Sequence, residues 1–222
     1  MLVVLGLRSE LTMVGQTQQM LYYFALHLAE KVGFSMPFFK SLPENAGPPD
    51  IFVTHKDLYG LWAEMSQLLM NGPSPLSRGE RELILAFAAG VAGCSFVYMA
   101  HAQVAYELGI DEGLVEQLVE DFEGARIDTR LRPLLAFVRK LTLSGSSITQ
   151  VDADAVFAAG WDEKALHDVI AIAGRAAFMQ RLVEGYGFVT WTREVAREHA
   201  GKRVRLGYVN LYPALGARAS RS

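Results

Sequence analysis

The segment 76–109 constrains the fold more than any other part of the sequence, because it predicts two apolar helices separated by a short break. Ser77 is followed three residues later by Glu80, a capping-box pattern that predicts a helix beginning directly after the serine. Gly93 predicts the end of this helix. Cys94, the only cysteine of the chain, then falls in the first turn of the second helix.

The chemistry of this helix pair depends on three side chains. Cys94 and His101 are expected on one face of the second helix, about two turns apart. Unpaired N–H groups at a helix start favour a thiolate, which predicts a reactive cysteine. Glu82 lies among apolar neighbours on the first helix, and a carboxylate that faces inward there needs a partner. A hydrogen bond from His101 would supply one, so we expect the three side chains to share a pocket.

The spacing of Glu82, Cys94 and His101, followed by a Leu-Gly helix end, resembles the core of the carboxymuconolactone decarboxylase and AhpD-like alkylhydroperoxidase superfamily. The opening LSRGEREL resembles its peroxidase-related branch. In redox members of the superfamily the core reads Glu…Cys-x-x-Cys-x-x-x-His; the two cysteines cycle between dithiol and disulfide, and the glutamate and histidine relay protons. Val97 occupies the position of the second cysteine in this chain.

This resemblance implies an all-α, AhpD-like multi-helical bundle that assembles as a homo-oligomer, either a dimer, a trimer or a hexamer. It implies three catalytic residues, Cys94, His101 and Glu82. It also implies three residues that bind a small-molecule substrate, Tyr98, Phe96 and Arg181, the last in an FMQRL segment that resembles an Asn-Arg pair of the peroxidase-related branch.

Three functions remain open. In the first, an antioxidant peroxidase, the Cys94 thiolate attacks a hydroperoxide, His101 and Glu82 move the proton, and an external thiol reduces the sulfenic acid. In the second, Glu82 and His101 act as acid and base on a small carboxylate or lactone without redox chemistry, and Arg181 holds the carboxylate. In the third, the chain is a catalytically silent oligomeric scaffold. The LSRGEREL pattern favours the first.

Each of these side chains also has a purely structural interpretation. A lone cysteine often packs as a small apolar residue, and a histidine on an apolar helix face is often a core residue satisfied by one hydrogen bond. Tyr98 fits aromatic packing, and Arg181 fits a surface salt bridge. The sequence alone does not choose between these interpretations.

Composition narrows the classes of partner. With 21 basic and 24 acidic side chains, the net charge of -3 gives no electrostatic footprint for nucleic acid. The apolar start Met1–Leu7 is too short to span a bilayer, so we expect a soluble protein. A single cysteine excludes an intrachain disulfide framework and fits a reducing cytoplasm. No metal or other cofactor is expected, because the remaining histidines share no ligand spacing: His27, His55, His167 and His199.

The rest of the chain predicts further helices and no strand, because period-two alternation is absent. An uncertain extension, 1–19, precedes a single helical domain, 20–202, and a tail or oligomer arm, 203–222, follows it. Self-association is expected from the apolar surplus. Beside the pair in 76–109, the predicted helices cover about 18–32, 51–70, 111–119, 132–143, 149–159, 163–184 and 190–200.

Overall fold

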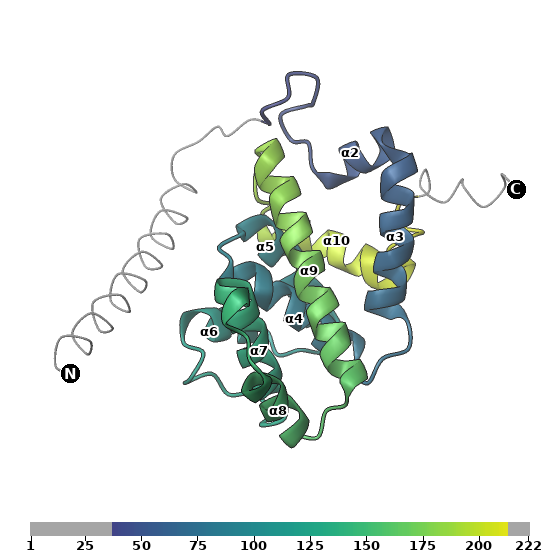
Figure 1. Cartoon of the computed structure of the whole chain (residues 1–222). Coiled ribbons are helices and arrows are strands. Elements are labelled where there is room, and N and C mark those ends of the chain that lie inside the picture. Colours follow the sequence, from purple (N-terminus) through teal and green to yellow (C-terminus); the bar gives the residue numbers. More distant parts are fainter. Residues whose placement is uncertain (1–36, 213–222) are drawn as a thin grey trace, which may run out of the picture. The chain divides into compact units, whose positions relative to one another are not determined.

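Residues 37–212 are described by a computed structural model, and within this range the prediction of an all-helical protein is confirmed (Figure 1). The predicted helix at 18–32, the extension 1–19 and the last ten residues of the predicted tail lie outside the described range. The elements are α2 (Pro48–Thr54), α3 (Lys56–Asn71), α4 (Arg78–Val91), α5 (Ser95–Glu107), α6 (Leu114–Glu120), α7 (Leu131–Ser144), the 3-10 turn η1 (Gly145–Ser147), α8 (Gln150–Ala158), α9 (Glu163–Tyr186) and α10 (Arg193–Leu206).

The predicted capping box begins α4. The Glu80 backbone N–H donates to the Ser77 hydroxyl at 3.2 Å, and the Ser77 N–H donates to the Glu80 carboxylate at 2.6 Å. Gly93 has φ of 78°, in the left-handed region that favours glycine, and it separates α4 from α5. Cys94 is the N-cap residue of α5, one position before the first turn that the sequence predicted. Two apolar helices therefore meet at this glycine, as predicted.

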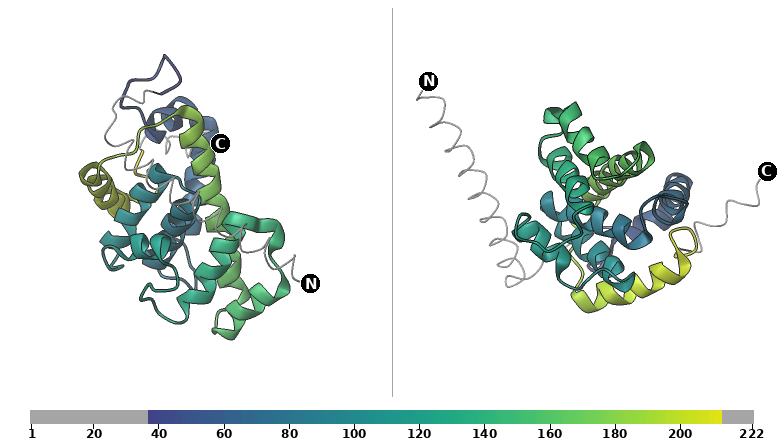
Figure 2. Two further views of the ribbon diagram at one scale, coloured as in Figure 1. Left: turned by 90° about the vertical axis from the view of Figure 1, so that its left-hand side faces the viewer. Right: turned by 90° about the horizontal axis from the view of Figure 1, so that it is seen from below.

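Helices α4 and α5 form the centre of the bundle. In both views of Figure 2 they lie between α9 on one side and α10 on the other. Every residue of α4 from Glu82 to Val91 is buried, so this helix supplies much of the core. None of the helices between residues 37 and 212 has the length and apolar character needed to cross a membrane.

Two helix starts differ from the prediction. A separate helix, α2, begins at Pro48, three residues before the start of the helix predicted over 51–70. Proline is tolerated in the first turn of a helix, where the backbone N–H has no intrahelical partner. Helix α6 begins after Gly113, which has φ of 87°, and not directly after Asp111.

The segment 203–212, assigned to a tail or oligomer arm, begins within a helix. Helix α10 continues to Leu206, and Tyr208 is 6% exposed and packs in the core. Only two residues of α10, Ala196 and Ala200, are buried. The helix is therefore largely polar and gives little apolar periodicity to recognise in the sequence. Its placement brings the segment 203–212 back onto α5 and α3.

Candidate active site

A buried acid–imidazole pair lies where α4 and α5 pack together. Glu82 Oε2 and His101 Nδ1 are 2.7 Å apart, and the two residues are 2% and 4% exposed. The structure thus contains the hydrogen bond that the sequence predicted as the partner of this carboxylate. Because an unpaired buried charge costs several kcal/mol, on the order of 3–5 when one partner is removed, the contact is a requirement of burying Glu82.

The second oxygen of Glu82 is also satisfied. The Tyr208 hydroxyl donates to Glu82 Oε1 at 2.6 Å, from a residue that follows α10. Burial alone would raise the pKa of the Glu82 carboxyl, but His101, the Arg203 guanidinium and the Tyr208 hydroxyl together hold that pKa below its usual value. Glu82 is therefore an ionised carboxylate. Burial, followed by the nearby carboxylate, raises the pKa of Tyr208, which stays a neutral donor.

The contacts of His101 fix its tautomer. Arg203 places one terminal nitrogen 3.1 Å from His101 Nε2, and a guanidinium has donors only. His101 Nε2 must therefore accept, which leaves the ring proton on Nδ1 to be donated to Glu82. Burial, and next the charges of Arg203 and Arg175, lower the pKa of His101, although Glu82 opposes this. The imidazole is neutral, and its basic nitrogen faces Arg203.

A second arginine, Arg175 of α9, lies beside this cluster. Its side chain is buried, its Nε donates to the Ser66 hydroxyl at 3.1 Å, and its guanidinium carbon lies 4.8 Å from the centre of the Tyr208 ring. Arg203 contacts the same ring at 5.1 Å. Two guanidinium groups therefore share one aromatic ring, next to a single carboxylate.

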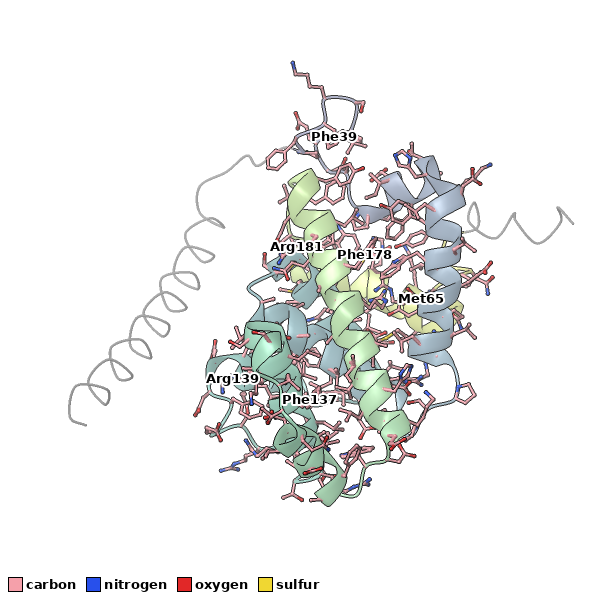
Figure 3. The ribbon with its side chains drawn as sticks, in the orientation of Figure 1. Phe39, Met65, Phe137, Arg139, Phe178 and Arg181 are labelled. Atoms are coloured by element: carbon pink, nitrogen blue, oxygen red, sulfur yellow. The ribbon has the colours of Figure 1, made fainter. Side chains whose placement is uncertain are left out.

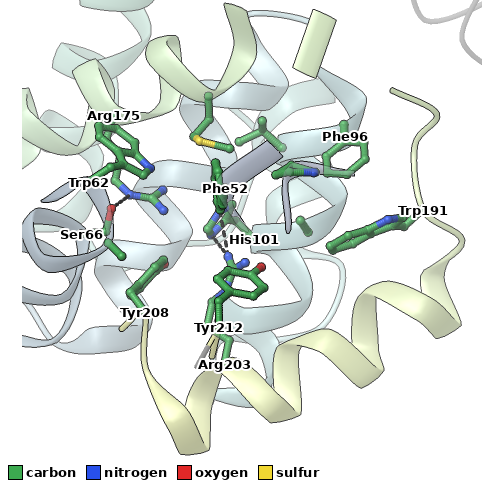
Figure 4. A pocket seen from close by; sticks show the side chains of 15 residues that line it. Phe52, Trp62, Ser66, Phe96, His101, Arg175, Trp191, Arg203, Tyr208 and Tyr212 are labelled. Atoms are coloured by element: carbon green, nitrogen blue, oxygen red, sulfur yellow. Dashed lines mark hydrogen bonds between the residues drawn. The ribbon is translucent and has the colours of Figure 1, made fainter. Parts of the chain in front are cut away.

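These groups surround a small cavity, shown in Figure 4. Its volume is about 40 Å³, room for a few water molecules or a small ligand group. His101, Arg175 and Arg203 provide its charged and basic wall. Aromatic and aliphatic side chains from several elements provide the rest, among them Phe52, Trp62, Phe96, Val97, Trp191 and Tyr212.

Cys94 is placed differently from the prediction. It is 3% exposed and is not among the described residues that line the cavity, whereas Val97 is. Burial raises the pKa of the Cys94 thiol to about 11, and the backbone N–H groups at the start of α5 offset only part of that effect. The expectation of a thiolate favoured by the helix start is therefore wrong, because desolvation outweighs the helix terminus.

The three predicted substrate-binding residues do not lie together in the structure. Phe96 lines the cavity and contacts Trp191, with ring centres 4.9 Å apart. Tyr98 is half-buried next to Gly90, and it is not among the described lining residues. Arg181 lies on the surface of α9 (Figure 3), with 76% of its side chain exposed, and it pairs with Glu184 at 3.4 Å. The salt bridge considered for Arg181 is thus present, and the described cavity wall does not include this residue.

The sequence analysis missed Arg175, Arg203 and Tyr208 as site residues. Arg175 follows Ile172 by three positions and precedes Met179 by four, which is the spacing of the buried face of α9. That signal was available, because an arginine on an apolar stripe needs a partner. No comparable signal in the sequence pointed to Arg203 and Tyr208, since they belong to the segment assigned to a tail.

Solved structures are similar to this chain, whereas the sequence comparisons find no match. The sequence matches no protein-family model, and no curated protein matches it. A peroxidase-related protein of Silicibacter sp. TM1040 has a similar solved structure, with 24% identity, a TM-score of 0.60, and coverage of 64% of this chain and 74% of that one. An AhpD-core, peroxidase-related protein of Ralstonia eutropha JMP134 is similar at 19% identity and a TM-score of 0.62, over 78% and 86% of the chains. The predicted resemblance is confirmed at this level: the chain has the AhpD-like fold of peroxidase-related proteins.

Proposed function

We propose that the protein is a general acid–base enzyme that moves a proton on a small carboxylate or lactone without redox chemistry. The observation that carries this proposal is the Glu82–His101 pair, because His101 is among the residues that line the cavity. A neutral imidazole has a lone pair that can take a proton, and the neighbouring carboxylate stabilises the imidazolium that forms.

The proposed step transfers one proton. His101 Nε2 takes a proton from the substrate carbon next to a carbonyl group, and the electrons of the C–H bond move into the carbonyl to give an enolate. The proton then returns from the imidazolium to carbon. Glu82 stays ionised throughout and orients the ring, since Tyr208 and His101 satisfy both of its oxygens.

The peroxidase hypothesis has weaker support. A thiol peroxidase needs an accessible thiolate, and Cys94 is buried, with a pKa raised to about 11. Val97 lines the cavity with a side chain that has no redox chemistry. The printed descriptions of the similar structures call those proteins peroxidase-related, which favours testing this activity directly.

The silent-scaffold hypothesis also has less support. The cluster keeps an ionised carboxylate, a neutral imidazole and two guanidinium groups together in the interior. Replacing a buried ionic cluster with apolar side chains of similar volume is often neutral or stabilising. A chain with only a structural task has no need of this arrangement.

The test is proton exchange. Pyruvate, acetoacetate and γ-butyrolactone are incubated with the protein in heavy water, and loss of the protons next to the carbonyl is followed by NMR. We expect exchange of at least one compound above the uncatalysed rate. Glu82→Gln and His101→Gln should lower it at least a hundredfold, a typical effect for a lost acid–base group, and Cys94→Ser should leave it unchanged.

The same preparations are assayed with tert-butyl hydroperoxide and dithiothreitol. Hydroperoxide consumption that disappears in Cys94→Ser, without any exchange that depends on Glu82 and His101, would contradict the proposal and establish the thiol peroxidase. If the folded protein shows neither activity, both enzymatic hypotheses are wrong and the scaffold interpretation remains.

A further inference from the structure

The cavity carries an uncompensated positive charge. Arg175 and Arg203 each contribute one charge, and arginine stays protonated in proteins. Glu82 contributes one negative charge, while His101 and Tyr208 are neutral. The net charge of this cluster is therefore +1, inside a largely apolar wall.

Unused hydrogen-bond donors accompany this charge. One terminal nitrogen of Arg175 is buried and has no hydrogen-bond partner among residues 37–212, and the same holds for Nε of Arg203. Arg175 is 5% exposed, so bulk water does not compensate its donor. A buried donor without a partner costs about 1–3 kcal/mol, and more when it is charged. Both arginines line the cavity, and Ser66 holds Arg175 in place through Nε (Figure 4).

We infer that the cavity binds one singly charged carboxylate, held by Arg175 and Arg203. A carboxylate supplies the missing negative charge, and its two oxygens can accept from the donors that lack partners. This inference rests on the proposed function and deepens it, because it selects the carboxylate over the neutral lactone as the substrate class. It also replaces Arg181, which is exposed on the surface of α9, as the residue that holds the substrate.

Binding of the anion also prepares the base. Arg203 donates to His101 Nε2 at 3.1 Å, so the basic nitrogen is engaged in the structure described here. A carboxylate bound at Nε of Arg203 attracts the whole guanidinium and weakens this contact. The lone pair of Nε2 then becomes available for the substrate proton. Arg203 thus acts as a binding residue and as a positioning residue for His101.

The experiment compares acetate with acetamide, a neutral molecule of nearly the same shape. Thermal unfolding of the full chain is followed in a zwitterionic buffer without added chloride, with either compound between 1 and 50 mM. Acetate should raise the unfolding midpoint in a saturable way, and acetamide should not. Equal effects of the two compounds would overturn the inference, and this comparison needs no variant.

Matched arginine variants locate the site. Arg175→Gln and Arg203→Gln should each weaken acetate binding at least tenfold. Arg181→Gln on α9 and Arg205→Gln on α10 remove an exposed arginine from the same two helices and should leave binding unchanged. If the exposed variants weaken binding as much as Arg175→Gln and Arg203→Gln do, acetate binds elsewhere and the inference is wrong.

The two proposals fail separately. Proton exchange that requires Glu82 and His101, in a protein that does not distinguish acetate from acetamide, would overturn the carboxylate site and leave the acid–base function. Acetate binding that requires Arg175, in a protein without proton exchange, would overturn the acid–base function and leave the carboxylate site. In the first case the lactone becomes the favoured substrate class.

Discussion

The Tyr208 hydroxyl donates a hydrogen bond to Glu82 Oε1 at 2.6 Å, although the two residues are 126 positions apart in the chain. Tyr208 follows α10, and Glu82 lies in the most buried helix of the bundle. The contact connects the last described segment to the centre of the candidate site. It makes the protonation state of the acid depend on the docking of α10.

Tyr208→Phe should destabilise the protein by about 1–3 kcal/mol, because it removes a hydrogen bond from a buried carboxylate. It should also raise the pKa of Glu82. Urea unfolding at pH 7 measures the loss of stability. Tyr186→Phe is the control, since this ring stacks on Phe39 and is not among the described cavity residues. Equal losses in the two variants would show that the bond to Glu82 contributes nothing specific.

Stability should fall on acidification in a way that depends on His101. The folded-state pKa of His101 lies below the ordinary value of about 6.5, so the unfolded chain binds a proton that the folded chain does not. The free energy of unfolding therefore decreases as the pH falls from about 6.5 towards the lowered pKa. The slope is up to about 1.4 kcal/mol per pH unit for one proton. The Glu82 pKa is also depressed, so its contribution is lost at still lower pH.

His101→Gln should remove this part of the slope between pH 6.5 and 5. Urea unfolding at several pH values gives the free energy for both proteins. His167→Gln, which replaces an exposed histidine on α9, should keep the wild-type slope. A wild-type slope in His101→Gln would mean that another group takes up the proton.

Native Cys94 should react slowly with a thiol reagent such as DTNB. A pKa of about 11 leaves roughly 300-fold less thiolate at neutral pH than a free cysteine, whose pKa is near 8.5, and burial slows the reaction further. Val151→Cys places a thiol at a residue of α8 that is 75% exposed and should add one rapidly reacting group per chain. The double variant Cys94→Ser/Val151→Cys is the control and should keep that rapid phase. Rapid labelling of the wild type would instead show that Cys94 is accessible.

Two helical glycines should respond oppositely to alanine. A Cβ at Gly90 of α4 would lie 2.6 Å from Val119 Cγ2 and 3.1 Å from the Tyr98 ring, so Gly90→Ala should destabilise the protein by about 1–3 kcal/mol. Gly174 of α9 has no atom within 4 Å of such a Cβ, and Gly174→Ala should stabilise by up to about 1 kcal/mol. Thermal unfolding compares the two. Stabilisation by both substitutions would contradict the close packing around Gly90.

Local signals predicted the parts of the fold that depend on neighbouring residues. The Ser77 capping box and the break at Gly93 are both present, because each is decided within one helical turn. The hydrogen bond between Glu82 and His101 followed from one buried acid that needed a partner. The resemblance to AhpD-like proteins gave the fold correctly.

The remainder of the site depends on distant contacts. The reactivity expected for Cys94 came from its position at a helix start, but its burial is decided by packing that the local sequence does not encode. Arg203 and Tyr208 reach the site through α10, a helix with little apolar periodicity. The catalytic roles of Glu82, His101 and Cys94 stay predictions, and the proton-exchange and hydroperoxide assays separate them.

The late position of α10 in the chain has a consequence for biosynthesis. A ribosome releases α4 and α5 well before Arg203 and Tyr208 are translated, so the nascent chain holds its acid and imidazole without the residues that later cover them. The cluster can be completed only after residue 208 has been translated, so a chain stalled before residue 203 lacks both contacts.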